Sequence, residues 1–128
     1  MTSDDWRAVV IAHAREARPR ECCGVLLGHG AQIAEAMPAG NAATEPTRFV
    51  LDPADHIRIR REARARGLDV IGFYHSHPHS APEPSERDRQ EAAYDDHLYL
   101  IVSLVTEPPA LRLFRLCDGG FAPVTLPG

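Results

Sequence analysis

The sequence has no lysine and few aromatic residues. All 14 of its basic residues are arginine, which, beside so much alanine and proline, we interpret as coding bias rather than chemistry. Aromatic residues make up 6% of the 128 residues, so we expect a core built mainly from Val, Ile, Leu and Ala. Hydrophobic residues make up 44%, and the length suits one small domain. We therefore predict a single domain over residues 1–128.

Other absences exclude whole classes of protein. The net charge is −4, so the chain has no general excess of positive charge for nucleic-acid binding. No apolar run approaches the 18 residues that span a membrane, and the acidic stretch MTSDDWRAVV lacks the apolar centre of a signal peptide. Three cysteines (Cys22, Cys23 and Cys117) make no disulfide framework. We expect a cytoplasmic protein that binds neither nucleic acid nor membranes.

Hydrophobic periodicity predicts both helices and strands. Three helices are expected, over residues 3–18, 53–66 and 85–94, with Ser3, Asp52 and Ser85 as their capping residues. The expected strands are a hairpin over 22–37, a short strand over 48–51, a long strand over 68–77, and three consecutive strands over 97–105, 110–117 and 121–126. Residues 38–47 and 78–84 have loop composition. This predicts an α/β fold with a mixed, mostly antiparallel sheet and about three packed helices.

The candidate chemistry lies in a pair of histidines at the end of the long strand. His75 and His77 are two residues apart, so in a strand both imidazoles point to the same face. Two neighbouring imidazoles can begin a zinc site, which needs at least one further ligand. His77 is followed at fixed distances by Ser85 and Asp88 at the start of the next helix. The second His-x-His pair, which ends at His79, has no such partners at the same spacing.

These residues have complementary chemistry. If the Pro-rich loop folds back, Asp88 can join the two imidazoles as a third zinc ligand. Two neutral histidines and one carboxylate leave the zinc positively charged, which lowers the pKa of a bound water molecule towards about 7. The Ser85 hydroxyl can then donate a hydrogen bond to an oxyanion. A general base is still missing from this set.

The wider pattern resembles the JAMM/MPN family of zinc metalloproteases. The resemblance rests on Glu21 followed by CCGVLLG, and on HSHP followed by Ser85 and Asp88, and it extends to the Asn41-to-Phe49 stretch. It implies a cytidine-deaminase-like α/β fold. It also implies that His75, His77 and Asp88 bind one zinc ion, that Glu21 is the general acid/base acting through the zinc water, and that Ser85 stabilises the tetrahedral intermediate.

The resemblance also implies a substrate. The family cleaves isopeptide or peptide bonds after the C-terminal Gly-Gly of ubiquitin or ubiquitin-like proteins. This chain is too short for the two insertions of the eukaryotic deubiquitinating members, so it is more similar to the minimal prokaryotic members. The expected partner is a ubiquitin-like sulfur-carrier protein, as for the CysO-cysteine peptidases. The leaving group, which could be cysteine, a lysine side chain or a short peptide, stays open, and so does a homodimer.

Simpler interpretations compete with each of these roles. The chain could be a non-catalytic MPN-type scaffold that binds a ubiquitin-like partner without cutting it. A zinc deaminase would require H-x-E and P-C-x-x-C, and neither is present. Ser85 could be only a helix cap, and Glu21 could simply face solvent. The adjacent Cys22 and Cys23 are expected to be buried and unpaired, and the other five histidines are not expected to be ligands.

Overall fold

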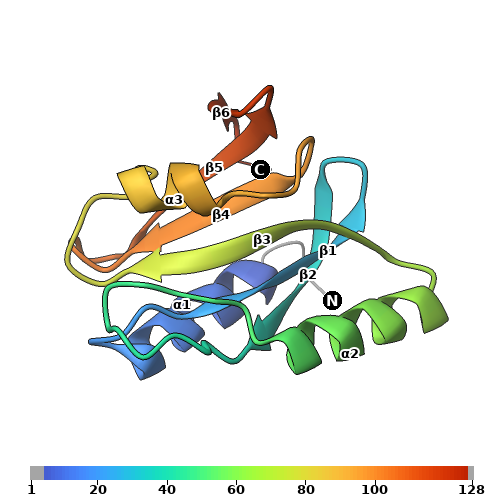
Figure 1. The fold of residues 1–128 in the computed structure, drawn as a ribbon, viewed down its shortest axis with the longest axis horizontal. Coiled ribbons are helices and arrows are strands. Elements are labelled where there is room, and N and C mark those ends of the chain that lie inside the picture. Colours follow the sequence, from blue (N-terminus) through green and yellow to red (C-terminus); the bar gives the residue numbers. More distant parts are fainter. Residues whose placement is uncertain (1–4, 127–128) are drawn as a thin grey trace.

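The computed structural model describes residues 5–126, which form one six-stranded sheet with three helices (Figure 1). The strands are β1 (Cys23–His29), β2 (Gln32–Ala39), β3 (Asp69–His77), β4 (Leu98–Ser103), β5 (Ala110–Cys117) and β6 (Gly120–Val124), and the helices are α1 (Asp5–Ala17), α2 (Pro53–Ala65) and α3 (Glu86–Glu91). The strand order is β2-β1-β3-β4-β5-β6. Strands β3 and β4 run parallel and the other neighbouring pairs are antiparallel, so the predicted mixed, mostly antiparallel sheet is confirmed.

Most predicted elements are confirmed to within a few residues, and three predictions need correction. The segment 48–51 forms no strand, because its pairing is limited to one bridge between Leu51 and Asn41. Strand β2 continues into the predicted loop as far as Ala39, and Pro38 is tolerated there because β2 lies at the edge of the sheet. The predicted cap Ser3 lies outside the described residues.

The third correction concerns the length of α3, which ends at Glu91 instead of Tyr94. The backbone becomes extended at Ala92, and the chain then turns towards the sheet. Tyr94 packs against Phe73, with ring centroids 4.9 Å apart, and its backbone amide donates to the Tyr99 hydroxyl. Packing of Tyr94 on the sheet therefore replaces the last helical turn that local propensity favours.

The two faces of the sheet carry different helices. Trp6, Val10 and Ala14 of α1 are buried on one face, together with Leu26 and other apolar side chains of the strands. On the opposite face, Ile59 of α2 is buried in a second apolar cluster. Helix α3 has no buried residue of its own, and lies on the same side of the sheet as α2 (Figure 1). None of the helices in the described part of the chain is long and apolar enough to cross a membrane.

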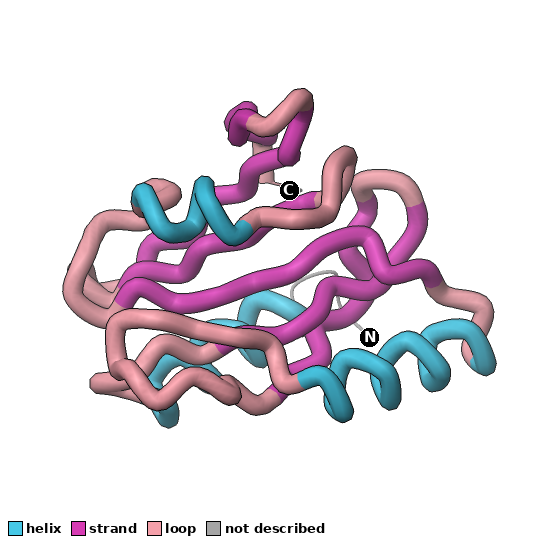
Figure 2. The backbone as a smooth tube through the Cα atoms, viewed as in Figure 1, coloured by secondary structure: helices cyan, strands magenta, loops and turns pink. Residues whose placement is uncertain are grey.

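Two long connections meet at one end of the sheet. Figure 2 shows that the segment between β2 and α2 and the segment between β3 and α3 both lie where β3 ends. The second of these holds its shape through hydrogen bonds to the sheet: the Ser103 hydroxyl donates to the Ser80 carbonyl at 2.6 Å, and Arg112 forms an ion pair with Glu83. This end of the sheet therefore brings together residues far apart in the sequence.

Candidate metal centre

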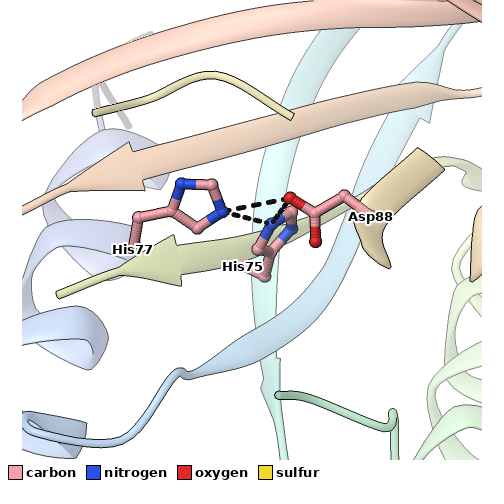
Figure 3. Close-up of side chains that lie close together, drawn as sticks. All are labelled: His75, His77 and Asp88. Carbon is pink, nitrogen blue, oxygen red and sulfur yellow. Dashed lines mark hydrogen bonds and ion pairs between the residues drawn. The ribbon is translucent and has the colours of Figure 1, made fainter. Parts of the chain in front are cut away.

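The last residues of β3 supply two buried imidazoles to one face of the sheet. His75 and His77 are 3% and 4% exposed, and the intervening Ser76 points to the opposite face, where its hydroxyl accepts from the Cys22 amide at 2.8 Å. The loop after β3 then folds back and brings α3 over the two rings. Asp88, in the first turn of α3, lies against both imidazoles (Figure 3).

The three side chains converge on one small volume. Asp88 Oδ2 lies 3.0 Å from the Nε2 atom of each histidine, and the two Nε2 atoms lie 3.2 Å apart. One ligand atom from each of the three residues falls within 4.8 Å of the others, which makes this a group that could bind a metal ion. The structure thus brings together the three residues that the sequence pattern selected.

The chemistry of these atoms suits a cation. His77 Nδ1 lies 2.8 Å from the Ala81 carbonyl, which can only accept, so Nδ1 carries the hydrogen and Nε2 of the neutral ring presents a lone pair. That lone pair faces Asp88 Oδ2 and His75 Nε2. A proton on His77 Nε2 lets the ring donate to Asp88 Oδ2, and its loss leaves a lone pair beside the carboxylate, where a divalent cation could take the place of the proton. Nitrogen and carboxylate ligands of this kind suit zinc.

The three side chains of this group shift one another's pKa values. Burial lowers the pKa of His75, although its hydrogen bond to Asp88 favours the charged form. Burial also opposes charge on His77, but hydrogen bonds to Asp88 and to the Ala81 carbonyl raise its pKa above the usual value. Burial of Asp88 is likewise outweighed, because hydrogen bonds from both imidazoles hold the pKa of this carboxyl well below its usual range. The carboxylate is therefore ionised and ready to bind a cation.

Ser85 fixes the position of Asp88 through a capping box. The Asp88 amide donates to Ser85 Oγ at 3.0 Å, and the Ser85 amide donates to Asp88 Oδ2 at 2.9 Å. Ser85 is exposed, and a hydroxyl that accepts one hydrogen bond still has its own hydrogen to donate. The predicted cap at Ser85 is confirmed, and the cap leaves its hydroxyl able to donate to another group.

Glu21 lies beside this group, just before β1. Cys23 pairs with His75 in the antiparallel register, and continuing that register places Glu21 opposite His77. Burial raises the pKa of the Glu21 carboxyl to about 7, and the attraction of His77 opposes the rise. Glu21 is partly buried rather than facing open solvent. A carboxyl group with a pKa near neutrality can both accept and return a proton.

The two cysteines after Glu21 point to opposite faces of the sheet, as neighbouring residues of an extended chain do. Cys22 packs into the apolar cluster under α1, whereas Cys23 lies on the face of the metal centre. Both are buried and unpaired, as expected, and burial raises the pKa of the Cys22 thiol to about 11 and that of Cys23 to about 12. Neither thiol is an ionised nucleophile at neutral pH.

A hollow of about 430 Å³ adjoins the candidate metal centre. His75 and Asp88 form part of its wall, and the rest is mainly apolar. Phe49 stacks on the His75 ring, with ring centroids 4.5 Å apart and an interplanar angle of 19°. The sequence pattern gave no role to Phe49, because nothing in its spacing shows that the loop folds back over β3. Only its place within the family-like Asn41-to-Phe49 stretch pointed to this region.

The other histidines have separate surroundings. His13 lies 2.7 Å from the Tyr74 hydroxyl, His29 is near Asp69, and His56 contacts Arg60. Within residues 5–126, no group of three potential metal ligands includes any of these histidines, nor His79 or His97.

Comparison with known proteins identifies the family. The model of "Prokaryotic homologs of the JAB domain" matches residues 3–117. The desampylase of Haloferax volcanii is 41% identical over 106 residues, which cover 77% of this chain and 76% of that protein. The CysO-cysteine peptidase of Mycobacterium tuberculosis is 35% identical over 115 residues, which cover 86% of this chain and 77% of that protein.

The fold is similar to that of a solved structure as well. The solution structure of protein DSY2949 from Desulfitobacterium hafniense matches with a TM-score of 0.85 at 29% identity, covering 93% of this chain and 85% of that one. Together with the family match, this confirms the minimal prokaryotic JAMM/MPN type that the motifs predicted. The chain belongs to the family of prokaryotic homologues of the JAB domain and is a JAMM-type hydrolase of the peptidase and isopeptidase class.

Proposed function

We propose that this chain is a zinc-dependent peptidase or isopeptidase that hydrolyses the amide bond after the C-terminal Gly-Gly of a ubiquitin-like sulfur carrier. The proposal rests above all on the convergence of His75, His77 and Asp88, with their ligand atoms 3.0–3.2 Å apart and Glu21 alongside. In a family of hydrolases, this set of side chains supplies a metal site and a separate carboxylate for proton transfer.

His75 Nε2, His77 Nε2 and Asp88 would hold the metal ion. When bound, zinc in such a site acidifies a coordinated water molecule and polarises a carbonyl oxygen. The protein contributes the fixed orientation of its ligands. The Ala81 carbonyl fixes the tautomer of His77, and the capping box with Ser85 fixes Asp88. Partners of this kind keep ligands in place and raise their affinity for the metal.

Glu21 is the proposed general base and acid. Its carboxylate accepts a proton from the attacking water molecule as the new carbon–oxygen bond forms at the scissile carbonyl. It then returns this proton to the amide nitrogen as the carbon–nitrogen bond breaks, so the products are a carboxylic acid and an amine, which at neutral pH ionise to a carboxylate and an ammonium group. A pKa raised to about 7 by burial suits both steps near neutral pH.

Ser85 is proposed to act on the reacting carbonyl oxygen. Its hydroxyl accepts from the Asp88 amide, and the remaining hydroxyl hydrogen can be donated to the developing oxyanion. Donors of this kind stabilise charge that appears only on the way to the tetrahedral intermediate. Ser85 would then serve both as a helix cap and as a catalytic donor.

The substrate is proposed from the relatives and the family resemblance. One relative is named a desampylase and another a CysO-cysteine peptidase. A ubiquitin-like carrier with a Gly-Gly tail accounts for both, and the leaving group is cysteine, a lysine side chain or a short peptide. We also propose a cytoplasmic location, because the exposed Cys117 and the two buried cysteines are all free.

The alternative is a scaffold that binds a ubiquitin-like partner without cutting it. A scaffold has no need for a converging ligand set or for a carboxyl group of raised pKa beside it. Retention of both features in this chain favours the hydrolase. The alternative would gain support if the zinc-loaded protein bound a carrier but released no product.

The test uses the zinc-loaded full chain and three forms of one ubiquitin-like carrier. The Gly-Gly terminus is linked to cysteine, to a lysine side chain, or to a short peptide, and products are identified by mass spectrometry. Cleavage of at least one form, lost on chelation and restored by zinc, is expected. Glu21→Gln should keep the zinc and lower kcat by about 10²–10⁴-fold. Full activity of Glu21→Gln would contradict the role of Glu21.

A further inference from the structure

The side-chain amide of Asn41 forms four hydrogen bonds, all of them with backbone groups around the site. Its Nδ2 donates to the carbonyl of Glu21 at 2.9 Å and to that of Arg48 at 3.0 Å. Its Oδ1 accepts from the amides of Ala43 at 2.9 Å and Val50 at 3.0 Å. One half-buried side chain therefore connects both ends of the loop between β2 and α2 to the segment before β1.

The backbone of Glu21 is held from this loop on both sides. Its carbonyl accepts from Asn41, and its amide donates to the Pro46 carbonyl at 3.2 Å. Regular strand pairing is replaced here, because β1 begins only at Cys23. The position of the Glu21 carboxyl beside the candidate metal centre thus depends on the loop as well as on the sheet, to which the neighbouring Cys22 is still bonded.

The same loop also covers one of the proposed metal ligands. Phe49 stacks on the His75 ring, and its two chain neighbours, Arg48 and Val50, are both bonded to Asn41. Loss of the Asn41 amide would release these two backbone groups together. The orientation of the Phe49 ring over His75 would then be less restricted.

We propose that Asn41 is a positioning residue that holds Glu21 in place for proton transfer and holds Phe49 against His75. This inference rests on the proposed function, in which Glu21 transfers protons and His75 binds the metal ion. Asparagine suits the position because the site needs two donors and two acceptors on one short side chain. An aspartate at this position would lack both donors, and an alanine would leave four backbone groups without their partner.

The test is a double-mutant cycle on the zinc-loaded full chain. Asn41→Ala is expected to lower kcat by roughly 100-fold with a smaller change in KM, because misplacing a reacting group by about 1 Å costs that much. In the Glu21→Gln background, the same substitution should cause little further loss, since the group that Asn41 positions is already inactive. Glu45→Ala, which removes exposed ion pairs from the same loop, is the matched control and should keep full activity.

A spectroscopic readout tests the Phe49 part of the proposal without any substrate. The visible absorption of the cobalt-substituted protein reports ligand geometry, and it should change in Asn41→Ala and stay unchanged in Glu45→Ala. If Asn41→Ala does not fold, Asn41→Asp serves in the same cycle. It keeps the two bonds accepted from Ala43 and Val50 and loses the donated bonds to Glu21 and Arg48.

The outcomes separate this inference from the proposed function. If Asn41→Ala lowers the melting temperature but leaves kcat and the cobalt spectrum unchanged, Asn41 is merely structural and the inference is wrong. If the fold loss in kcat of the double mutant equals the product of the two single-mutant losses, Asn41 does not act through Glu21 and the inference is likewise wrong. If Glu21→Gln itself keeps full activity, the proposed function of Glu21 fails, whatever Asn41→Ala does.

Discussion

The α1 face of the sheet is closed by a continuous apolar layer, whereas the α2 and α3 face contains a hollow and buried polar side chains. Leu26 and Val10 are completely buried on the first face. On the second, His75 and His77 are buried beside a space of about 430 Å³. Helix α3, which supplies Asp88, buries none of its residues. Complete packing on one face stabilises the fold and allows incomplete packing at the site.

Strand β3 contributes side chains to both faces of the sheet. Its alternate residues Tyr74 and Ser76 point towards α1. Tyr74 lies in the apolar cluster there, and the Ser76 hydroxyl accepts a hydrogen bond from the Cys22 amide. Phe73, His75 and His77 point the other way. Substitutions on the two sides of this sheet should therefore separate stability from activity.

Removal of a proposed metal ligand should have the largest effect. His75→Ala is expected to lose the bound zinc and to lower kcat/KM by about a thousandfold or more, because a metal ion contributes several kcal/mol to such reactions. Metal content is measured by native mass spectrometry together with activity. The exposed His79, two residues beyond the pair, is the control, and His79→Ala should keep both the zinc and the activity. Full activity of a zinc-free His75→Ala protein would contradict the metal site.

An apolar truncation on the α1 face should affect stability alone. Leu26→Ala is expected to lower the free energy of unfolding by about 2–5 kcal/mol, because it leaves a cavity in a closely packed layer. The kcat of the folded fraction should stay unchanged. Leu51→Ala, on the partly open side that borders the hollow, is the matched comparison and should cost clearly less. Chemical denaturation of both variants measures the difference, and equal costs would show that the two faces are packed alike.

Ser85 allows the capping and catalytic roles to be separated. Ser85→Ala removes both the cap and the hydroxyl, whereas Ser85→Gly removes the hydroxyl at a capping cost of only a few tenths of a kcal/mol. If the hydroxyl stabilises an oxyanion, both variants should lose about 10²–10³-fold in kcat. Only Ser85→Ala should lose about 1 kcal/mol of stability. Full activity of Ser85→Gly would leave Ser85 as a cap alone.

The sequence predicted the face of His75 and His77 correctly because strand alternation is a local rule. The spacing to Ser85 and Asp88 selected the group that the fold brings together, since a helix cap is also a local signal. The loop between β2 and α2 could not be predicted in this way. Its shape depends on the four bonds of Asn41, which join segments up to 20 residues apart in sequence. The length of α3 was wrong for a similar reason, because tertiary packing overrides helix propensity.

The last expected effect is a pH-dependent change in stability at Glu21, measured on the chelated protein. Burial raises the pKa of this carboxyl from 4.5 to about 7, so between these values the folded state holds more protons than the unfolded state. The contribution of Glu21 to the free energy of unfolding is therefore complete below pH 4.5 and is lost as the pH rises to 7. Glutamine does not titrate, so the stability of Glu21→Gln should not show this loss. The free energy of unfolding of Glu21→Gln should therefore exceed that of the parent protein by an amount that grows by roughly 1–3 kcal/mol from pH 5 to pH 8.

Chemical denaturation at several pH values measures this difference. Glu107→Gln, at a carboxyl that is 77% exposed, is the control and should show no such trend. A stability difference between Glu21→Gln and the parent protein that did not change with pH would mean that burial imposes no cost on the Glu21 charge. The growing difference predicted here would instead show that burial of the ionised Glu21 carboxylate beside the proposed metal centre lowers the stability of the fold. Glu21→Gln would then stabilise the apoprotein and lower kcat, whereas Leu26→Ala would destabilise the fold and leave kcat unchanged.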